Sequence, residues 1–86
     1  MKKIKFVIKN FQLYTEDIYF EFSDIPNVGD LIKIKTYLPE ELLYTFEYEL
    51  SKTYYSEYGK VIEKIWDKEN EISFPILILE LSPRID

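Results

Sequence analysis

Residues 72–81 read Ile-Ser-Phe-Pro-Ile-Leu-Ile-Leu-Glu-Leu and contain the longest apolar stretch of the chain. A segment of this length, rich in isoleucine and leucine and bounded by polar residues, is typical of a β-strand. Apolar side chains occupy both faces from Ile76 to Leu79, which predicts protein above and below the strand. Pro75 cannot donate a hydrogen bond to a ladder, so it indicates an edge or a bulge at that position.

Another strand is expected directly before this one. Residues 60–66 follow Gly59 and carry valine, isoleucine and tryptophan, but their alternation is broken at residues 63–64, which indicates a bulge or a sharp bend. Residues 67–71 are polar, and Asn70 suits the left-handed backbone conformation of a turn. These segments predict a hairpin.

Two further strands are expected near the start of the chain. Apolar residues occupy the even positions of residues 4–8 and switch to odd positions near residues 9–11, which indicates a β-bulge. Residues 15–17 are typical of a turn, and residues 18–22 alternate again. The pattern predicts an antiparallel hairpin.

A tight turn precedes the next expected strand. Residues 26–32 read Pro-Asn-Val-Gly-Asp-Leu-Ile, where proline fixes φ and glycine permits a positive φ. The strand follows over residues 32–35. This Pro-x-x-Gly-Asp-x-Ile pattern resembles a turn of small SH3-like β-barrel proteins of uncharacterised function, bacterial or phage. The resemblance covers residues 18–34 and 59–81, and it implies a shape and no activity.

Residues 38–56 fit two structures. Pro39 followed by two glutamates is typical of a helix start. Apolar residues then recur every fourth position, at Leu42, Phe46, Leu50 and Tyr54. Residues 44–50 also alternate as a strand would, and their aromatic content favours that reading. We expect a helix over residues 40–52 that crosses one mouth or one face of the sheet.

Together these elements predict a mainly β (α+β) fold. The expected form is a five-stranded antiparallel bent sheet, or an SH3-like small barrel, with one helix inserted between strands 3 and 4. The predicted domain spans residues 1–82, and residues 83–86 are expected to form a C-terminal tail. The second face of strand 72–81 is expected to be covered by the helix.

The composition restricts the chemistry that the chain can perform. It has no histidine, no cysteine and one arginine, Arg84. Imidazole and thiolate are the groups that titrate near neutral pH without strong tuning, so their absence argues against an enzyme. Cysteine ligands and disulfides are excluded. Residues 67–71 carry alternate acids but lack the pattern of a calcium loop, so no metal and no cofactor are expected.

The charge of the chain also restricts its partners. Its formal net charge is −5: residues 1–38 carry +1, and residues 39–86 carry −6, from five basic residues against eleven acidic ones. Such a balance argues against binding along a nucleic-acid backbone. The apolar stretch from Pro75 to Leu79 is far shorter than the ~20 residues of a membrane-spanning helix, so no membrane association and a cytoplasmic location are expected.

The leading functional hypothesis is a non-enzymatic protein-interaction module that binds a protein partner through an aromatic and acidic surface. Tyrosine and tryptophan are enriched at protein interfaces, and acids raise the rate and selectivity of association. Tyr55 and Tyr58 fall off the helical stripe and are expected to be exposed. In the alternative interpretation the rings cap the core and the acids only solubilise the surface. The candidate binding residues are Tyr54, Tyr55, Tyr58, Trp66, Glu47 and Glu49.

Other functions remain open at this point. A small barrel can bind single-stranded nucleic acid when aromatic rings lie beside a basic groove. The residues for that function would be Lys2, Lys3, Lys5, Lys33, Lys35, Tyr19 and Tyr37. A carboxylate enzyme would need two acids in a wet cleft, with raised pKa. A homodimer formed through strand edges or surplus aromatic rings is a further hypothesis.

Overall fold

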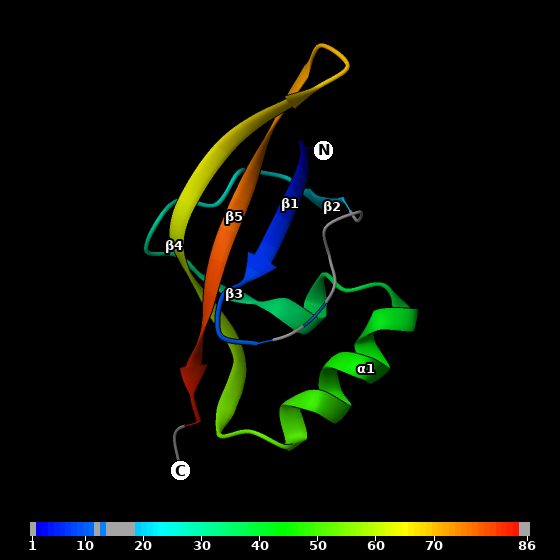
Figure 1. Ribbon diagram of the computed structural model, residues 1–86, viewed down its shortest axis with the longest axis vertical. Helices are drawn as coiled ribbons and strands as arrows, with labels where there is room; N and C mark the ends of the chain where they lie inside the picture. Colours follow the sequence, from blue (N-terminus) through cyan, green and yellow to red (C-terminus); the bar gives the residue numbers. More distant parts are fainter. Residues whose placement is uncertain (1, 12, 14–18, 85–86) are drawn as a thin grey trace.

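The protein folds as a curled sheet with one α-helix beside it (Figure 1). The structure, a computed structural model, describes residues 2–11, 13 and 19–84. The predicted turn at residues 15–17 lies outside the described residues. The elements are β1 (Lys2–Ile8), β2 (Phe20–Phe22), β3 (Leu31–Lys33), the 3₁₀ helix η1 (Ile34–Thr36), α1 (Glu40–Ser51), β4 (Tyr55–Glu69) and β5 (Ile72–Pro83).

The five strands form one sheet in the order β2-β1-β5-β4-β3, curled into a half-barrel. The helix lies between β3 and β4 in the sequence, so the mainly β fold and the inserted helix are confirmed. The helical interpretation of residues 40–52 was the correct one. Proline precedes the first turn and Glu40 and Glu41 lie in it, where carboxylates interact favourably with the helix dipole.

The sheet is mixed, so the prediction of wholly antiparallel strands was wrong for one pair. β1 runs parallel to β5, with a register from Lys5↔Ile76 to Ile8↔Leu79, whereas the other neighbours are antiparallel. Sequential strands joined by short turns must be antiparallel, but β1 and β5 are separated by the rest of the chain. Their direction is therefore set by tertiary packing, which local patterns do not reveal.

The apolar switch at residues 9–11 marks the end of a strand, and the predicted bulge there was wrong. β1 ends at Ile8, and the Lys9 N–H donates to the Leu79 carbonyl oxygen at 2.7 Å. Beyond that point, the side-chain amide of Asn10 takes the place of a backbone partner and forms two hydrogen bonds with the Leu81 backbone of β5. Its amide nitrogen donates to the Leu81 carbonyl at 3.3 Å, and its amide oxygen accepts from the Leu81 N–H at 2.9 Å.

β4 and β5 form a long hairpin that projects beyond the other strands (Figure 1). A bulge interrupts β4 between Val61 and Glu63, next to the predicted position. The turn has positive φ at Asn70 (51°) and Glu71 (68°), as the sequence indicated for Asn70. Pro75 lies just outside the ladder with β1, which begins at Ile76, so its missing N–H leaves that ladder intact.

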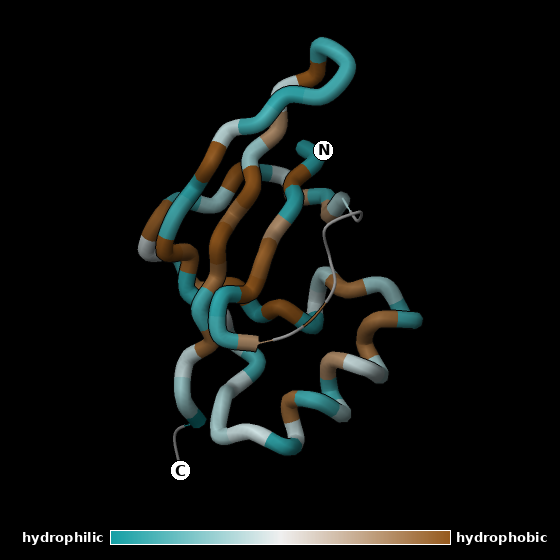
Figure 2. Tube along the Cα trace, in the orientation of Figure 1, coloured by the Kyte–Doolittle hydropathy of each residue, from teal (hydrophilic) through white to brown (hydrophobic). Residues whose placement is uncertain are grey.

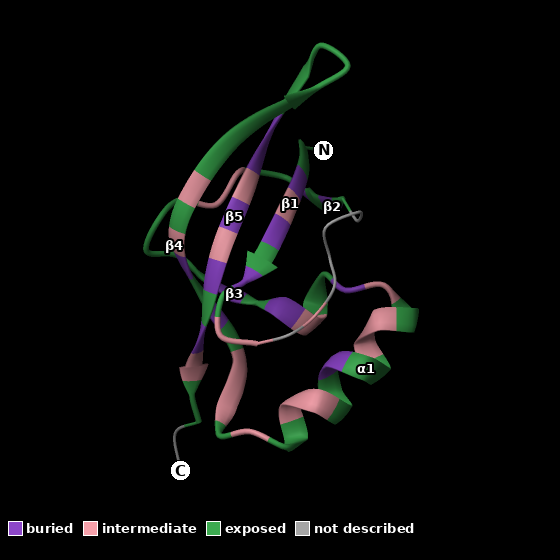
Figure 3. Ribbon diagram, in the orientation of Figure 1, coloured by how far each residue is buried: buried purple, intermediate pink, exposed green. Residues whose placement is uncertain are grey.

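Hydrophobic residues recur along β1 and β5 (Figure 2), where buried residues alternate with less buried ones, and α1 contributes one buried residue to the same core (Figure 3). Phe46 is fully buried with Leu77 and Leu79 in a single cluster, and its ring contacts Phe11 edge-on at 5.5 Å. The helix therefore covers the same face of β5 that the core occupies. Ile76 and Ile78 are half-buried on the opposite face of β5. The prediction that the helix covers that second face was therefore wrong.

Gly59 allows β4 to lie close to the neighbouring elements. A Cβ at this position would lie 2.8 Å from Cδ1 of Ile34 and 3.4 Å from Cβ of Leu79. Ile34 is fully buried, so its side chain has little room to move away. A side chain at this position would therefore force the end of the Ile34 side chain to shift.

We predict that Gly59→Ala lowers the free energy of unfolding by about 1–3 kcal/mol through overpacking. Ile34→Val removes the Cδ1 atom that the new methyl group would meet, so the double variant should be more stable than the sum of the single effects predicts. Urea denaturation of the four proteins measures this coupling. Strictly additive losses would contradict the proposed contact.

We also predict that Phe46→Ala lowers the free energy of unfolding by about 3–5 kcal/mol, since it leaves a cavity between α1 and the sheet. Tyr44→Ala on the exposed side of the same helix is the matched control and should change stability by less than about 0.5 kcal/mol. Similar losses for both variants, measured by thermal or urea denaturation, would show that the helix is not anchored through Phe46.

Candidate functional site

The structure separates the candidate binding residues that the sequence grouped together. Tyr54 directly precedes β4, and Tyr55 and Tyr58 lie at its start, whereas Trp66 lies far along the same strand, in the projecting hairpin. At about 3.3 Å per residue, roughly 26 Å of extended strand separates Tyr58 from Trp66. A single compact surface containing all these rings is therefore not formed, and three surfaces must be considered separately.

The first surface is the outward side of α1. Its tyrosines, Tyr44 and Tyr48, are 77% and 54% exposed, and Tyr54 just after the helix is 90% exposed. At 3.6 residues per turn, Tyr44 and Tyr48 each lie about 160° around the helix from the buried Phe46. Core packing thus directs them to solvent. We call Tyr44, Tyr48 and Tyr54 the tyrosine ridge.

The position at which the helix ends explains why Tyr54 is exposed although it continues the apolar stripe, and why Tyr55 is partly buried although it was expected to be exposed. α1 ends at Ser51, and the Thr53 hydroxyl donates to the Leu50 carbonyl at 2.8 Å, so the four-residue apolar period stops before Tyr54. Tyr54 is consequently exposed. Tyr55 begins β4 and packs partly buried against the core, contrary to the exposure predicted for it, whereas Tyr58 is 42% exposed as predicted.

The second surface is a shallow groove of about 640 Å³ at the start of β4, which we call the lower groove. Tyr55 and Tyr58 line it together with Leu31 of β3, which is 63% exposed. Arg84 also lines the groove. Its guanidinium donates to the carbonyl oxygens of Tyr55 (3.0 Å) and Leu50 (3.1 Å), so it fixes the helix end to the start of β4. β5 itself continues to Pro83, into the residues predicted as a tail.

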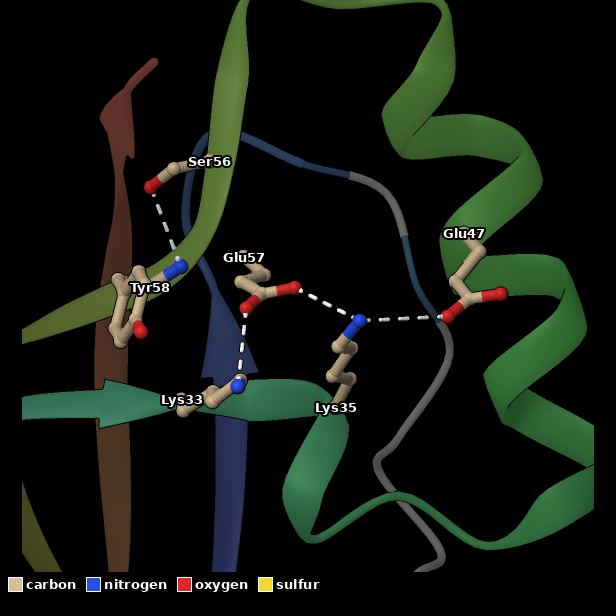
Figure 4. Close-up of polar contacts among 6 residues, drawn as sticks. All are labelled: Lys33, Lys35, Glu47, Ser56, Glu57 and Tyr58. Carbon is tan, nitrogen blue, oxygen red and sulfur yellow. Dashed lines mark hydrogen bonds and ion pairs between the residues drawn. The ribbon is translucent and has the colours of Figure 1, made fainter. Parts of the chain in front are cut away.

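The acids near these surfaces mostly face lysines (Figure 4). Glu57 lies 3.4 Å from Lys33 and 3.1 Å from Lys35, and Lys35 also lies 3.8 Å from Glu47 of α1. Glu49 lies 3.5 Å from Lys52. Glu47 and Glu49 therefore do not present a free negative face.

The same ion pairs shift the pKa values of their members. The hydrogen bond from Lys35 is the main cause that lowers the pKa of the Glu57 carboxyl below its ordinary value, with Lys33 adding to it. In turn, the hydrogen bond to Glu57 raises the pKa of the Lys35 ammonium. The network joins η1, β4 and α1.

The third surface is a groove of about 610 Å³ between the start of β1 and the projecting hairpin, which we call the upper groove. Trp66, 56% exposed, lines it with Lys2 and Lys3. Tyr19 also lines it, and its hydroxyl donates to a Glu69 carboxylate oxygen at 2.9 Å. This hydrogen bond raises the pKa of the Tyr19 phenol.

The residues of the nucleic-acid alternative are dispersed. Lys2, Lys3 and Lys5 lie on β1, and Lys33 lies on β3, with β5 and β4 between them in the sheet. Lys33 and Lys35 already face Glu57. The aromatic rings also have neighbours, because Lys5 lies over the Tyr19 ring at 4.8 Å and Tyr37 stacks on Phe22 at 4.2 Å.

Sequence reasoning missed the upper groove. The Tyr19–Glu69 hydrogen bond joins residues 50 positions apart, and no local pattern announces it. Tyr44 and Tyr48 carried a usable signal, because the helical period that buries Phe46 places both on the opposite side. The strand-like alternation of residues 44–50 competed with this helical pattern.

Two further properties of the described residues bear on function. Within residues 2–11, 13 and 19–84, no cluster of three or more aspartates and glutamates is arranged to hold a metal ion. In the same part of the chain, no helix combines the length and apolar character needed to cross a membrane.

Comparison with models of known protein families, with curated proteins and with solved structures finds no match to this chain. The resemblance to SH3-like barrels therefore stays a prediction.

We predict that Glu57→Gln lowers the thermal midpoint by a few degrees at neutral pH. Because the folded pKa of Glu57 is lowered, its contribution to stability is complete above its ordinary value of 4.5 and is lost as pH falls through the folded pKa. The difference between variant and wild type should therefore disappear in acid. Calorimetry from pH 7 down to pH 2 measures it.

Glu63→Gln is the control for that experiment, because Glu63 is an exposed β4 carboxylate with no lysine or arginine nitrogen within 4.0 Å among the described residues. A difference for Glu57→Gln that persists unchanged at pH 2 would contradict the charge-based role of this contact.

Proposed function

We propose that this chain is a non-enzymatic protein-binding module whose binding surface is the tyrosine ridge of α1. The observation that carries the proposal is the exposure of Tyr44 (77%) and Tyr48 (54%) on a helix whose opposite side carries the fully buried Phe46, together with the 90% exposure of Tyr54 just after the helix. A rigid helix presenting aromatic side chains to solvent is the arrangement that a protein partner can cover with little loss of conformational entropy.

The ridge also favours a particular chemistry in the partner. Glu40 and Glu41 lie in the first turn of α1, and among the described residues neither has a lysine or arginine nitrogen within 4.0 Å. The Lys52 ammonium lies 4.2 Å from the centre of the Tyr48 ring, so a ridge tyrosine already accepts a cation–π contact. Free carboxylates beside such rings suit lysine and arginine side chains of a partner.

The non-enzymatic part of the proposal is supported by the interior. Every residue that is buried in the described part of the chain is apolar, glycine or proline. The Glu57 pKa is shifted downward, the opposite direction from the raised pKa of a general acid. An apolar interior suits a module that acts through its outside.

The residues predicted from the sequence take different places in this proposal. Tyr54 belongs to the ridge, and Glu47 and Glu49 flank it on α1. Tyr55 and Tyr58 belong to the lower groove, and Trp66 belongs to the upper groove. The proposed surface thus keeps the aromatic and acidic character of the hypothesis but places it on the helix.

We predict that Tyr44→Ala with Tyr48→Ala abolishes partner binding while leaving the fold intact. Tagged wild type and variant would be used to capture proteins from the cells that express this chain, and captured proteins would be quantified by mass spectrometry. Proteins specific to the wild type should fall at least tenfold with the variant, and a purified partner should show the same loss by calorimetry.

The control is Leu31→Ala with Tyr58→Ala, which removes exposed apolar surface of the lower groove instead. This control should capture the same proteins as the wild type. Equal capture by the ridge variant, or a loss with the control alone, would refute the ridge as the binding surface.

A further inference from the structure

The face of the sheet that points away from the core is apolar along its centre. Side chains alternate along a strand, so the buried residues of β5 direct Ile76 and Ile78 to this face. The register places Ile65 opposite Ile76 and Val7 opposite Ile78. Val7 and Ile65 are 38% and 43% exposed, and none of the four is part of the core cluster. We call this side of β1, β5 and β4 the outer face.

The outer face has no cover within the described part of the chain. That part contains one α-helix and one sheet, and Phe46 holds the helix on the core side. A parallel pair such as β1 and β5 is normally covered on both of its faces. An apolar patch left bare on a small protein is typical of an interaction surface.

The charges of the outer face are divided between its two sides. On the β1 side, Lys3 and Lys5 alternate with core residues and share this face. On the β4 side, Glu63 lies opposite Ile78 and Asp67 lies opposite Phe74. Among the described residues, none of these four side chains has an oppositely charged group within 4.0 Å. The face therefore carries unpaired ammonium groups along one side and unpaired carboxylates along the other, with an apolar strand between them.

A two-fold axis along β5 brings these opposite charges together. Rotation about that axis lays β5 of one copy over β5 of a second copy, and it lays β1 over β4 of the second copy, because β1 and β4 are the two neighbours of β5. Lys5 of each copy then lies beside Glu63 and Asp67 of the other. An axis across the strands would instead lay β1 over β1 and bring lysines against lysines.

We propose that the outer face binds a second copy of this chain, in a face-to-face dimer whose two-fold axis runs along β5. Ile76 and Ile78 of the two copies pack in the centre, and a contact between Lys5 and Glu63 forms on each side. The proposal does not rest on the tyrosine ridge, which belongs to the helix on the core side of the sheet.

The margin of the outer face keeps this dimer weak. Lys60 of β4 lies opposite Glu80, and Lys9 directly follows β1. The same rotation brings Lys9 near Lys60 of the second copy, with Glu80 between them, so charge does not favour this end. The sheet also curls around its core, which confines contact to three strands, about 14 Å in width. Small interfaces are typical of weak complexes, so we expect the dimer at high protein concentration.

Other occupants match the outer face less well. An acidic peptide or a nucleic acid would be attracted by Lys3 and Lys5 but repelled by Glu63 and Asp67, and a basic partner would meet the reverse. The occupant must carry both signs, in reversed order on either side of an apolar centre. A second copy of the chain has that arrangement.

The test is analytical ultracentrifugation of the full chain from micromolar to millimolar concentration. We expect a monomer at the low end and a reversible dimer at the high end. Lys5→Glu alone and Glu63→Lys alone should each weaken association at least tenfold, since the contact then joins like charges. An equimolar mixture of these two variants should dimerise again, because the Lys5–Glu63 contacts across the axis then join opposite charges.

Matched controls separate this site from general charge and folding effects. Lys2→Glu and Glu40→Lys make the same charge changes at exposed positions outside the outer face, and each should leave association within about twofold of the wild type. Val7→Thr with Ile78→Thr should weaken association at least tenfold, and circular dichroism should show the wild-type fold, because neither residue belongs to the core cluster.

Three results would overturn the proposal. The first is a monomer at every concentration, and the second is a dimer that neither charge reversal weakens. The third is a loss in both single variants that mixing does not reverse, which would show that Lys5 and Glu63 do not meet across an axis. A dimer abolished by Tyr44→Ala with Tyr48→Ala, but unchanged by the outer-face variants, would assign self-association to the ridge.

Discussion

β5 is the strand on which the other strands depend. It pairs with β1 along one edge and with β4 along the other, and β2 and β3 join the sheet only through those two neighbours. Its odd-numbered residues from Leu77 to Leu81 supply the centre of the core. The face of β5 that carries Leu77, Leu79 and Leu81 is buried only if other side chains cover it, and Phe46 of α1 belongs to the same buried cluster.

That requirement determines where binding surfaces can form. Because α1 is fixed through its inner side, its tyrosines must face solvent, and they form the ridge. Because α1 covers only the core side of the sheet, Ile76 and Ile78 stay half-buried on the other side, and they form the centre of the outer face. Both surfaces are consequences of how the core is closed, and both lie outside it.

The sequence predicted the elements better than their arrangement. The helix, the bulge in β4 and the turn at Asn70 follow from local backbone preferences, and these were found. The parallel β1–β5 pair and the Asn10–Leu81 contacts join distant parts of the chain, where local patterns carry no information about direction or partner. The candidate rings were grouped by nearness in sequence, but Trp66 does not lie beside Tyr58, because one long strand carries both.

The most direct test of this account is amide hydrogen exchange of the native protein, measured by NMR. The core claim predicts that the ladder amides of Leu77 and Leu79 exchange only through global unfolding, since β5 is paired on both edges there. The same is expected of Val61 in β4, which lies between β5 and β3 and whose N–H donates to the Asp30 carbonyl oxygen. Ser73, on the part of β5 with one strand neighbour, should exchange much faster. Exchange of Leu77 and Leu79 as fast as that of Ser73 would contradict a fold organised around β5.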